Sequence, residues 1–203
     1  MKLYNSMGPN PKVVRMFMAE RGIEVELVEV DLMGAENRQA GYLKVNPAGQ
    51  LPALELDDGS VLSEITAICE YLDDKAGNSS LIGTSAEERG ETRMWSRRID
   101  LGILENLANG FRFAEGEALF KDRMRLIPHA ADDLKTTAQE KITWLDGQMD
   151  GKEYICGSRF SLADILLFVF LEFGVSVGQP LNAENKNIMA WYERVQSRPS
   201  ASA

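Results

Sequence analysis

The residues best suited to bind a ligand lie in a loop with two prolines, residues 46–54, which reads NPAGQLPAL and runs into a strand-like segment. Proline fixes φ and has no N–H group, so this stretch cannot begin as an ordinary ladder strand. A cis peptide bond is tolerated before a proline between loop and strand, and Pro52 is the candidate. We expect the Leu51 N–H to point away from the sheet, where it could pair with an extended ligand. A plain turn that feeds an edge strand is the alternative.

The other residues with reactive side chains are two cysteines and one histidine. Cys69 and Cys156 lie far apart, with no CxxC spacing and with apolar neighbours, so we expect both to be small buried core residues. His129 has no companion ligands, so the sequence supports neither a zinc site nor a histidine-activated nucleophile. We expect no metal.

Composition limits the kind of protein. The chain has 203 residues, of which 44% are hydrophobic, with a net charge of −9 and a pI near 4.8. This negative charge would repel nucleic acid, and no basic run offsets it. Neither a signal peptide nor an apolar stretch of membrane length is evident. We therefore expect a globular, cytoplasmic protein that binds neither nucleic acid nor a membrane.

The first part of the chain predicts a strand, a helix and a strand, followed by a loop and a hairpin. The expected elements are a strand at 3–4, a helix at 11–21, a strand at 23–30, a partly helical stretch at 36–44, hairpin strands at 54–56 and 61–62, and a helix at 65–72. Asn10 is the expected cap of the first helix because a proline follows it, and Ser63 is the expected cap of the last. Alternation of apolar and acidic residues predicts that Ile23, Val25 and Leu27 face inward.

The rest of the chain predicts helices only. Two long helices, at 87–115 and 122–149, should form an antiparallel pair. The sequence SLAD at 161–164 predicts a capping box, and the wholly apolar run at 165–171 that follows predicts a buried helix. A last helix is expected at 184–197.

This order of elements resembles the cytosolic glutathione transferases, which join a thioredoxin-like domain to an all-helical domain. The most specific features are the proline loop at 46–54, the spacing from it to Glu64, and the helix start at 161–165. The resemblance covers essentially the whole chain. It implies an α/β plus all-α fold: a thioredoxin-like domain at 1–76, a linker at 77–85 and an all-helical domain at 86–203.

The resemblance also implies a glutathione site in the first domain. Leu51, ahead of Pro52, would pair its main chain with the cysteinyl part of glutathione, as a short antiparallel addition to the sheet edge. Gln50 would lie beside the glycyl end. Glu64 falls where family members place a residue that meets the α-amino group.

The two carboxylates of glutathione have their own expected partners. The α-carboxylate would lie at the N-terminus of the helix near Glu64, where free N–H groups favour anions. Many family members have serine after that glutamate, whereas Ile65 leaves only its main-chain N–H. Arg38, with Asn37 before it, matches the loop position that commonly binds the glycine carboxylate. A solvated loop cation is the alternative for Arg38.

Thiol activation is expected at the start of the first helix. Lowering the thiol pKa from about 8.5 by about two units requires roughly 2.7 kcal/mol, and one hydrogen bond to a charged acceptor contributes about 1.5–3 kcal/mol. Gly8 aligns where serine, threonine or cysteine usually stands in the family, so cysteine-based thiol transfer loses its nucleophile. Asn10 resembles the asparagine of the Pro-Asn pair in the bacterial nu-like class, and Ser6 is the alternative donor. A helix cap and a turn residue are their respective alternatives, and Tyr4 is taken as a core residue.

By resemblance, the second substrate is a small hydrophobic electrophile, and Phe111 and Phe113 would line its pocket, although core or dimer contacts are the alternative for both. The expected protein is a homodimeric glutathione transferase with glutathione as co-substrate. A glutathione-dependent peroxidase or disulfide reductase, and a non-catalytic binding protein of the same fold, remain open alternatives.

Overall fold

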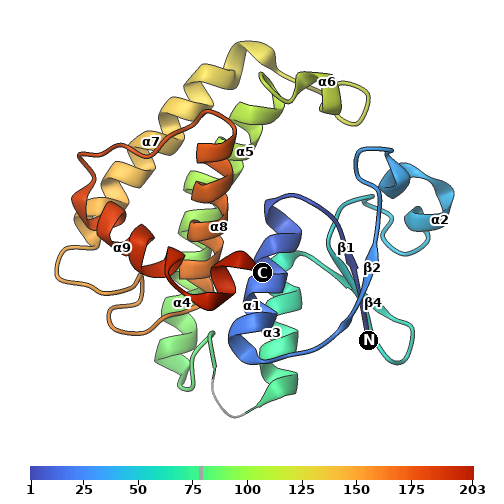
Figure 1. Ribbon diagram of the computed structural model, residues 1–203, viewed down its shortest axis with the longest axis horizontal. Coiled ribbons are helices and arrows are strands. Elements are labelled where there is room, and N and C mark those ends of the chain that lie inside the picture. Colours follow the sequence, from blue (N-terminus) through green and yellow to red (C-terminus); the bar gives the residue numbers. More distant parts are fainter. Residues whose placement is uncertain (78–79) are drawn as a thin grey trace. The chain divides into compact units, whose positions relative to one another are not determined.

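The computed structural model describes residues 1–77 and 80–203 (Figure 1). The chain divides into two compact units, which consist of Met1–Ile82 with Ser202–Ala203, and of Gly83–Ala201. The boundary between Ile82 and Gly83 falls inside the linker that the sequence predicts at 77–85. Residues 78 and 79 of that linker lie outside the described residues.

The first unit is built on a four-stranded sheet in the order β2-β1-β3-β4. Strands β1 (Lys2–Asn5) and β2 (Glu26–Glu29) are parallel, and β3 (Ala53–Glu55) pairs antiparallel with both β1 and β4 (Val61–Ser63). A parallel pair needs a crossover connection, which α1 (Pro9–Arg21) supplies.

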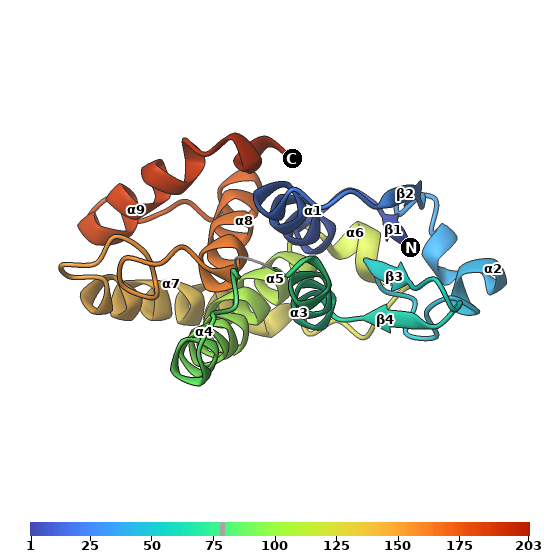
Figure 2. The same ribbon diagram turned by 90° about the horizontal axis from the view of Figure 1, so that it is seen from below.

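Helices cover both faces of this sheet. Helix α1 and helix α3 (Ile65–Ala76) lie side by side on one face, and the short helix α2 (Ala40–Leu43) lies on the other (Figures 1 and 2). A 3₁₀ turn at Glu36–Arg38 precedes α2. The apolar side chains expected to face inward on α1 are fully buried: Val13, Val14, Met16 and Phe17. This arrangement confirms the thioredoxin-like expectation for the first domain.

Helix α1 begins two residues earlier than predicted. The cap position is taken by Gly8, whose φ of 106° suits glycine, and Pro9 occupies the first helical position, where its missing N–H costs nothing. The prediction that Asn10 caps the helix is therefore wrong. Asn10 lies within the first turn instead.

The predicted inward position of Leu27 in the second strand is also wrong, whereas Ile23 and Val25, which precede the observed strand, are half-buried as predicted. Leu27 is 45% exposed, whereas Val28 is half-buried and Val30 is buried. Strand β2 begins at Glu26, later than expected, and is an outer strand of the sheet. Because side chains alternate along a strand, a shift of one residue moves the inward set to the other face.

The second unit is built from helices, with two isolated β-bridges at residues 154–159. The helical elements are α4 (Ala86–Ile99), a π-helical turn (Asp100–Leu104), α5 (Glu105–Arg112), α6 (Glu117–Phe120), a 3₁₀ turn (Pro128–Ala130), α7 (Ala131–Gln148), α8 (Leu162–Ser176), α9 (Lys186–Gln196) and a last 3₁₀ turn (Pro199–Ser202). The predicted helix at 87–115 thus ends three residues early and contains a π-helical turn. The one predicted at 122–149 begins only at Ala131, because Pro128 has no N–H to donate and restricts the residue before it.

Helix α8 confirms the predicted capping box and buried helix. The Ser161 N–H donates to Asp164 Oδ2 at 2.9 Å, and the Ser161 hydroxyl contacts the same oxygen. All residues from 162 to 171 are buried. Trp191 from α9 also donates to Asp164, through its indole N–H at 2.9 Å. This carboxylate therefore ties two helices together.

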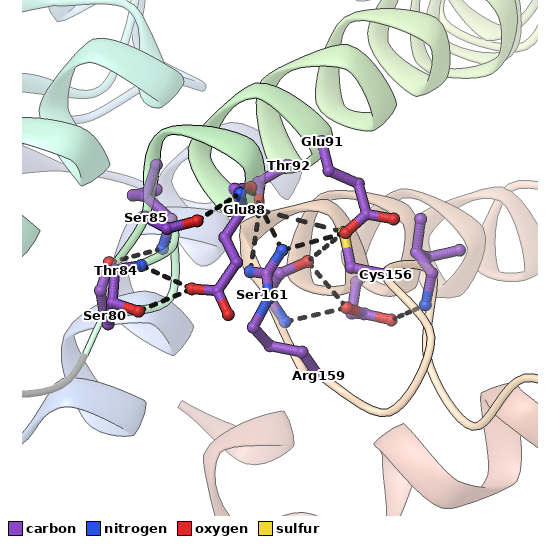
Figure 3. A network of polar contacts seen from close by, with 12 residues as sticks. Ser80, Thr84, Ser85, Glu88, Glu91, Thr92, Cys156, Arg159 and Ser161 are labelled. Carbon is purple, nitrogen blue, oxygen red and sulfur yellow. Dashed lines mark hydrogen bonds and ion pairs between the residues drawn. The ribbon is translucent and has the colours of Figure 1, made fainter.

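A polar network next to α8 contains one of the two cysteines (Figure 3). Arg159 donates to the Thr92 hydroxyl at 2.9 Å and pairs with Glu91 at 3.4 Å, and the Ser161 hydroxyl lies 3.6 Å from Cys156 Sγ. Burial raises the pKa of the Cys156 thiol. Cys69 is buried too, and both thiols are free. The prediction of two buried core cysteines is confirmed.

No helix within the described residues is both long and apolar enough to cross a membrane. In the same part of the chain, no group of three or more His, Cys, Asp or Glu side chains is arranged to hold a metal ion.

Candidate functional site

The proline loop ends in free main-chain groups. The Leu51–Pro52 peptide is cis, as predicted. Within residues 1–77 and 80–203, neither the N–H nor the C=O of Leu51 has a hydrogen-bond partner. Since β3 is an inner strand, these groups lie just ahead of its start and not along an outer edge of the sheet. They are placed to pair with an extended ligand.

The sheet register brings three candidate segments together. Ala53 pairs with Tyr4 on one side and with Ser63 on the other. Leu51 comes two residues before Ala53, Ser6 two residues after Tyr4, and Ile65 two residues after Ser63, so all three leave the sheet at the same end. The loop before α1, the proline loop and the start of α3 therefore meet at one end of the sheet.

The start of α3 differs from the prediction. Ser63 is the last residue of β4, so the helix cap is Glu64, which makes no side-chain cap hydrogen bond. Glu64 has φ 70° and ψ 120°, a conformation that costs a non-glycine residue roughly 1–3 kcal/mol. Its exposed carboxylate has no partner in the described part of the chain. Among the residues that the structure describes, the first N–H groups of α3, including that of Ile65, have no hydrogen-bond partner and can bind an anion.

Asn37 and Arg38 both contact the proline loop, although in different ways. Asn37 is 3% exposed, and its Nδ2 donates to the Gly49 carbonyl at 2.6 Å. Arg38 is exposed, and its Nη1 donates weakly to the Ala48 carbonyl at 3.3 Å. Asn37 is therefore suited to support the loop from inside. The other N–H groups of the exposed Arg38 guanidinium can donate to the carboxylate of a ligand.

The two candidate thiol activators differ in their environment. Ser6 is 4% exposed, and its hydroxyl donates to the Val30 carbonyl at 2.8 Å, which favours a structural role. The half-buried side-chain amide of Asn10 has no partner among the residues that the structure describes. Pro9 and Pro11 remove two N–H groups from the first turn, so Asn10 supplies both a main-chain and a side-chain donor there.

The side chain that holds the loop before α1 is Arg15, whose role was not predicted from the sequence. Arg15 Nη1 donates to Asn5 Oδ1 at 2.7 Å and to the Ser6 carbonyl at 3.3 Å. Asn5 in turn donates to Glu29 at 2.5 Å. Burial lowers the pKa of Arg15, and the charge of Glu29 opposes that shift. The signal available in the sequence was a single arginine among the apolar residues at 13–17 of the predicted helix.

The predicted electrophile-pocket residues lie in the second unit. The ring of Phe111 makes edge contacts with Phe120 at 6.2 Å and Phe173 at 5.2 Å between centroids, and Phe113 is buried. These contacts are typical of core packing. A role of Phe111 and Phe113 in binding an electrophile stays a prediction.

Known families match both units. The family model of the glutathione S-transferase N-terminal domain matches residues 8–75, and that of the glutathione S-transferase C-terminal domain matches residues 128–199.

Individual relatives extend the likeness over the whole chain. Glutathione S-transferase 2 of Saccharomyces cerevisiae is 32% identical over 197 residues, which are 95% of this chain and 84% of that protein. The crystal structure of Gtt2 from Saccharomyces cerevisiae superposes with a TM-score of 0.94 at 30% identity and covers 100% of this chain and 99% of that one. Probable elongation factor 1-gamma 1 of Arabidopsis thaliana is 27% identical over 184 residues, 88% of this chain but 42% of that protein. These matches, together with the four-stranded sheet and the cis Leu51–Pro52 peptide, show that the chain belongs to the cytosolic glutathione transferase superfamily.

Proposed function

We propose that this protein is a glutathione transferase that activates the glutathione thiol for attack on a small hydrophobic electrophile. The observation that carries the proposal is the main chain of Leu51, which has no partner in the described residues and lies at the same end of the sheet as the N-terminus of α3. A main-chain pairing site next to an anion site suits a short peptide with a free carboxylate. Family membership adds that the peptide is glutathione.

Each part of the tripeptide has a proposed partner. The cysteinyl unit pairs with the N–H and C=O of Leu51, ahead of Pro52. The α-carboxylate lies at the N–H of Ile65, and the α-amino group meets the carboxylate of Glu64. This last pairing gives the unpartnered Glu64 side chain a counter-charge.

The glycyl end would lie on the proline loop. Gln50, whose exposed side chain has no partner in the described residues, lies beside it, and Arg38 binds its carboxylate. Asn37 contributes indirectly, because its amide is already bonded to Gly49.

The thiol is activated at the N-terminus of α1. The Asn10 amide donates to the developing thiolate, and the helix end adds up to about 1 kcal/mol. Together with one charged hydrogen bond of about 1.5–3 kcal/mol, this reaches the roughly 2.7 kcal/mol needed for a shift of two pKa units. The thiolate then forms a bond to the electrophilic carbon, and the leaving group departs with the bonding electrons. Ser6 stays the alternative donor.

The test is the pKa of bound glutathione, read from the ultraviolet absorbance of its thiolate. We expect about 6.5, against about 8.5 for a free thiol. A bound thiol with an unshifted pKa would favour a non-catalytic binding protein, an alternative supported by Gly8 at the usual serine position and by the elongation-factor relative. Absence of binding at millimolar glutathione would overturn the proposal.

A second reaction, glutathione-dependent reduction of peroxides or disulfides, is favoured by the Pro9-Asn10 pair and its nu-like character. A panel of aryl halides, epoxides, peroxides and mixed disulfides separates this reaction from transfer to carbon. A homodimer and a cytoplasmic location complete the proposal, and light scattering and fractionation test them.

A further inference from the structure

Two side chains converge on the carbonyl oxygen immediately before Leu51. The Tyr42 hydroxyl donates to the Gln50 carbonyl at 2.6 Å, and Asn46 Nδ2 donates to the same oxygen at 2.9 Å. Asn37 binds the preceding carbonyl, that of Gly49, at 2.6 Å. Three donors thus hold two successive peptide groups of an otherwise irregular loop.

The Gln50 carbonyl and the Leu51 N–H belong to one peptide group. Because that group is planar and trans, the direction of its C=O fixes the opposite direction of its N–H. Two hydrogen bonds to the carbonyl therefore set the direction of the free Leu51 N–H. They also polarise the peptide group, which strengthens the N–H as a donor.

The donors are themselves held in place. Tyr42 is 6% exposed, packs with Val30 and Leu51, and makes an edge contact with the Tyr4 ring at 5.9 Å between centroids. Burial raises the pKa of Tyr42 to about 12, so its hydroxyl stays protonated near neutral pH. Asn46 is buried as well, and its Oδ1 accepts from the Ala48 N–H at 3.1 Å.

We propose that Tyr42 and Asn46 are positioning residues that aim the Leu51 N–H at the cysteinyl carbonyl of glutathione. This inference rests on the proposed function and deepens it. Neither side chain touches the ligand, since both are bonded to the Gln50 carbonyl on the opposite side of the peptide group from the N–H.

Tyr42→Phe removes the hydrogen bond from the Tyr42 hydroxyl to the Gln50 carbonyl and keeps the ring. Tyr4→Phe is its matched control, because the Tyr4 hydroxyl donates to Glu55 at 2.7 Å, away from the loop. We expect Tyr42→Phe to raise the Kd and KM for glutathione about 5- to 10-fold with little change in kcat, as expected for the loss of about one hydrogen bond. Tyr4→Phe should leave the Kd within about twofold while thermal stability falls in both variants. Equal effects of the two variants on the Kd would overturn the inference.

Asn46→Asp tests the second donor. It keeps the oxygen that accepts from Ala48 and replaces the donor to Gln50 by an acceptor. Since each donor compensates only in part for loss of the other, the double variant with Tyr42→Phe should weaken glutathione binding by more than the product of the single effects. Purely multiplicative effects would show that the two side chains do not share one role.

Order of the Leu51 amide in the ligand-free protein separates this inference from the proposed function. By ¹⁵N relaxation, we expect Tyr42→Phe to lower the order parameter of this amide and Tyr4→Phe to leave it unchanged. If the wild-type protein binds no glutathione, the proposed function fails. A Leu51 amide that is loosened in Tyr42→Phe and not in Tyr4→Phe would still support the positioning role of Tyr42. If the order of the Leu51 amide is unchanged in Tyr42→Phe, the positioning role of Tyr42 is refuted, whether or not glutathione binds.

Discussion

Replacement of Asn10 by alanine is the sharpest test of the thiol site. The Asn10 side chain has no partner in the described residues, so its loss should change the free energy of unfolding by less than about 0.5 kcal/mol. Loss of a charge-assisted hydrogen bond of about 1.5–3 kcal/mol should raise the pKa of bound glutathione by about 1.1–2.2 units. The variant should therefore fold normally and activate poorly.

The size of the rate effect depends on pH. With a wild-type thiol pKa of about 6.5, the thiolate fraction at pH 6.5 should fall about 7- to 80-fold in Asn10→Ala, whereas at about pH 9 the two proteins should agree within about twofold. Stopped-flow measurement of transfer to an aryl halide at saturating glutathione gives both rates. A uniform loss at all pH values would contradict a role in lowering the thiol pKa.

Ser6→Ala is the matched control for Asn10→Ala. Its hydroxyl donates to a buried carbonyl, that of Val30, so the variant should lose about 1–3 kcal/mol of stability and keep the thiol pKa. The ranking of the two residues is refuted if Ser6→Ala raises the thiol pKa and Asn10→Ala leaves it unchanged.

Three further predictions concern other described contacts. Arg21 and Asp73 form a buried ion pair at 2.7 Å, so Arg21→Ala should cost about 3–5 kcal/mol in urea unfolding, and Arg21→Met with Asp73→Leu should recover much of that loss. Glu64→Gln removes an unpartnered charge, so we expect unchanged unfolding but a Kd for glutathione about tenfold higher by calorimetry, because a charged hydrogen bond becomes a neutral one. Burial raises the pKa of Asp164 to about 6, above its value of about 3.9 in the unfolded chain. The folded state therefore holds this proton more tightly, so the stability of the wild type relative to Asp164→Asn should fall by about 1.3 kcal/mol from pH 5 to pH 7 in urea unfolding, and a flat difference would contradict the raised pKa.

Features that depend on neighbouring residues could be predicted from the sequence. The capping box at Ser161 and Asp164 and the hairpin turn with Gly59 at φ 82° depend on side-chain chemistry within four residues, and both are present. The proline before β3 and the buried apolar run of α8 belong to the same class. Such features need no knowledge of distant parts of the chain.

Predictions from the sequence were wrong where two local patterns fitted the same residues equally well. Both Gly8 and Asn10 can cap a helix whose first turn contains proline. The structure places the cap at Gly8, because glycine adopts the positive φ of that position without strain. At β2, alternation identified a strand but not which set faces inward. Pairing with β1 and the position at the sheet edge decided that set.

The chain by itself determined a two-part α/β and all-helical architecture and a proline loop with an unusual main chain, because periodicity, caps and proline stereochemistry are local properties. Only the tertiary structure decided that the segments with Ser6, Leu51 and Ile65 lie at the same end of the sheet, since strand register joins segments that lie far apart in sequence. The tertiary structure also showed that Tyr42 reaches the Gln50 carbonyl. A hydrogen bond across eight residues depends on how the loop packs on α2, and no spacing rule of the sequence encodes it.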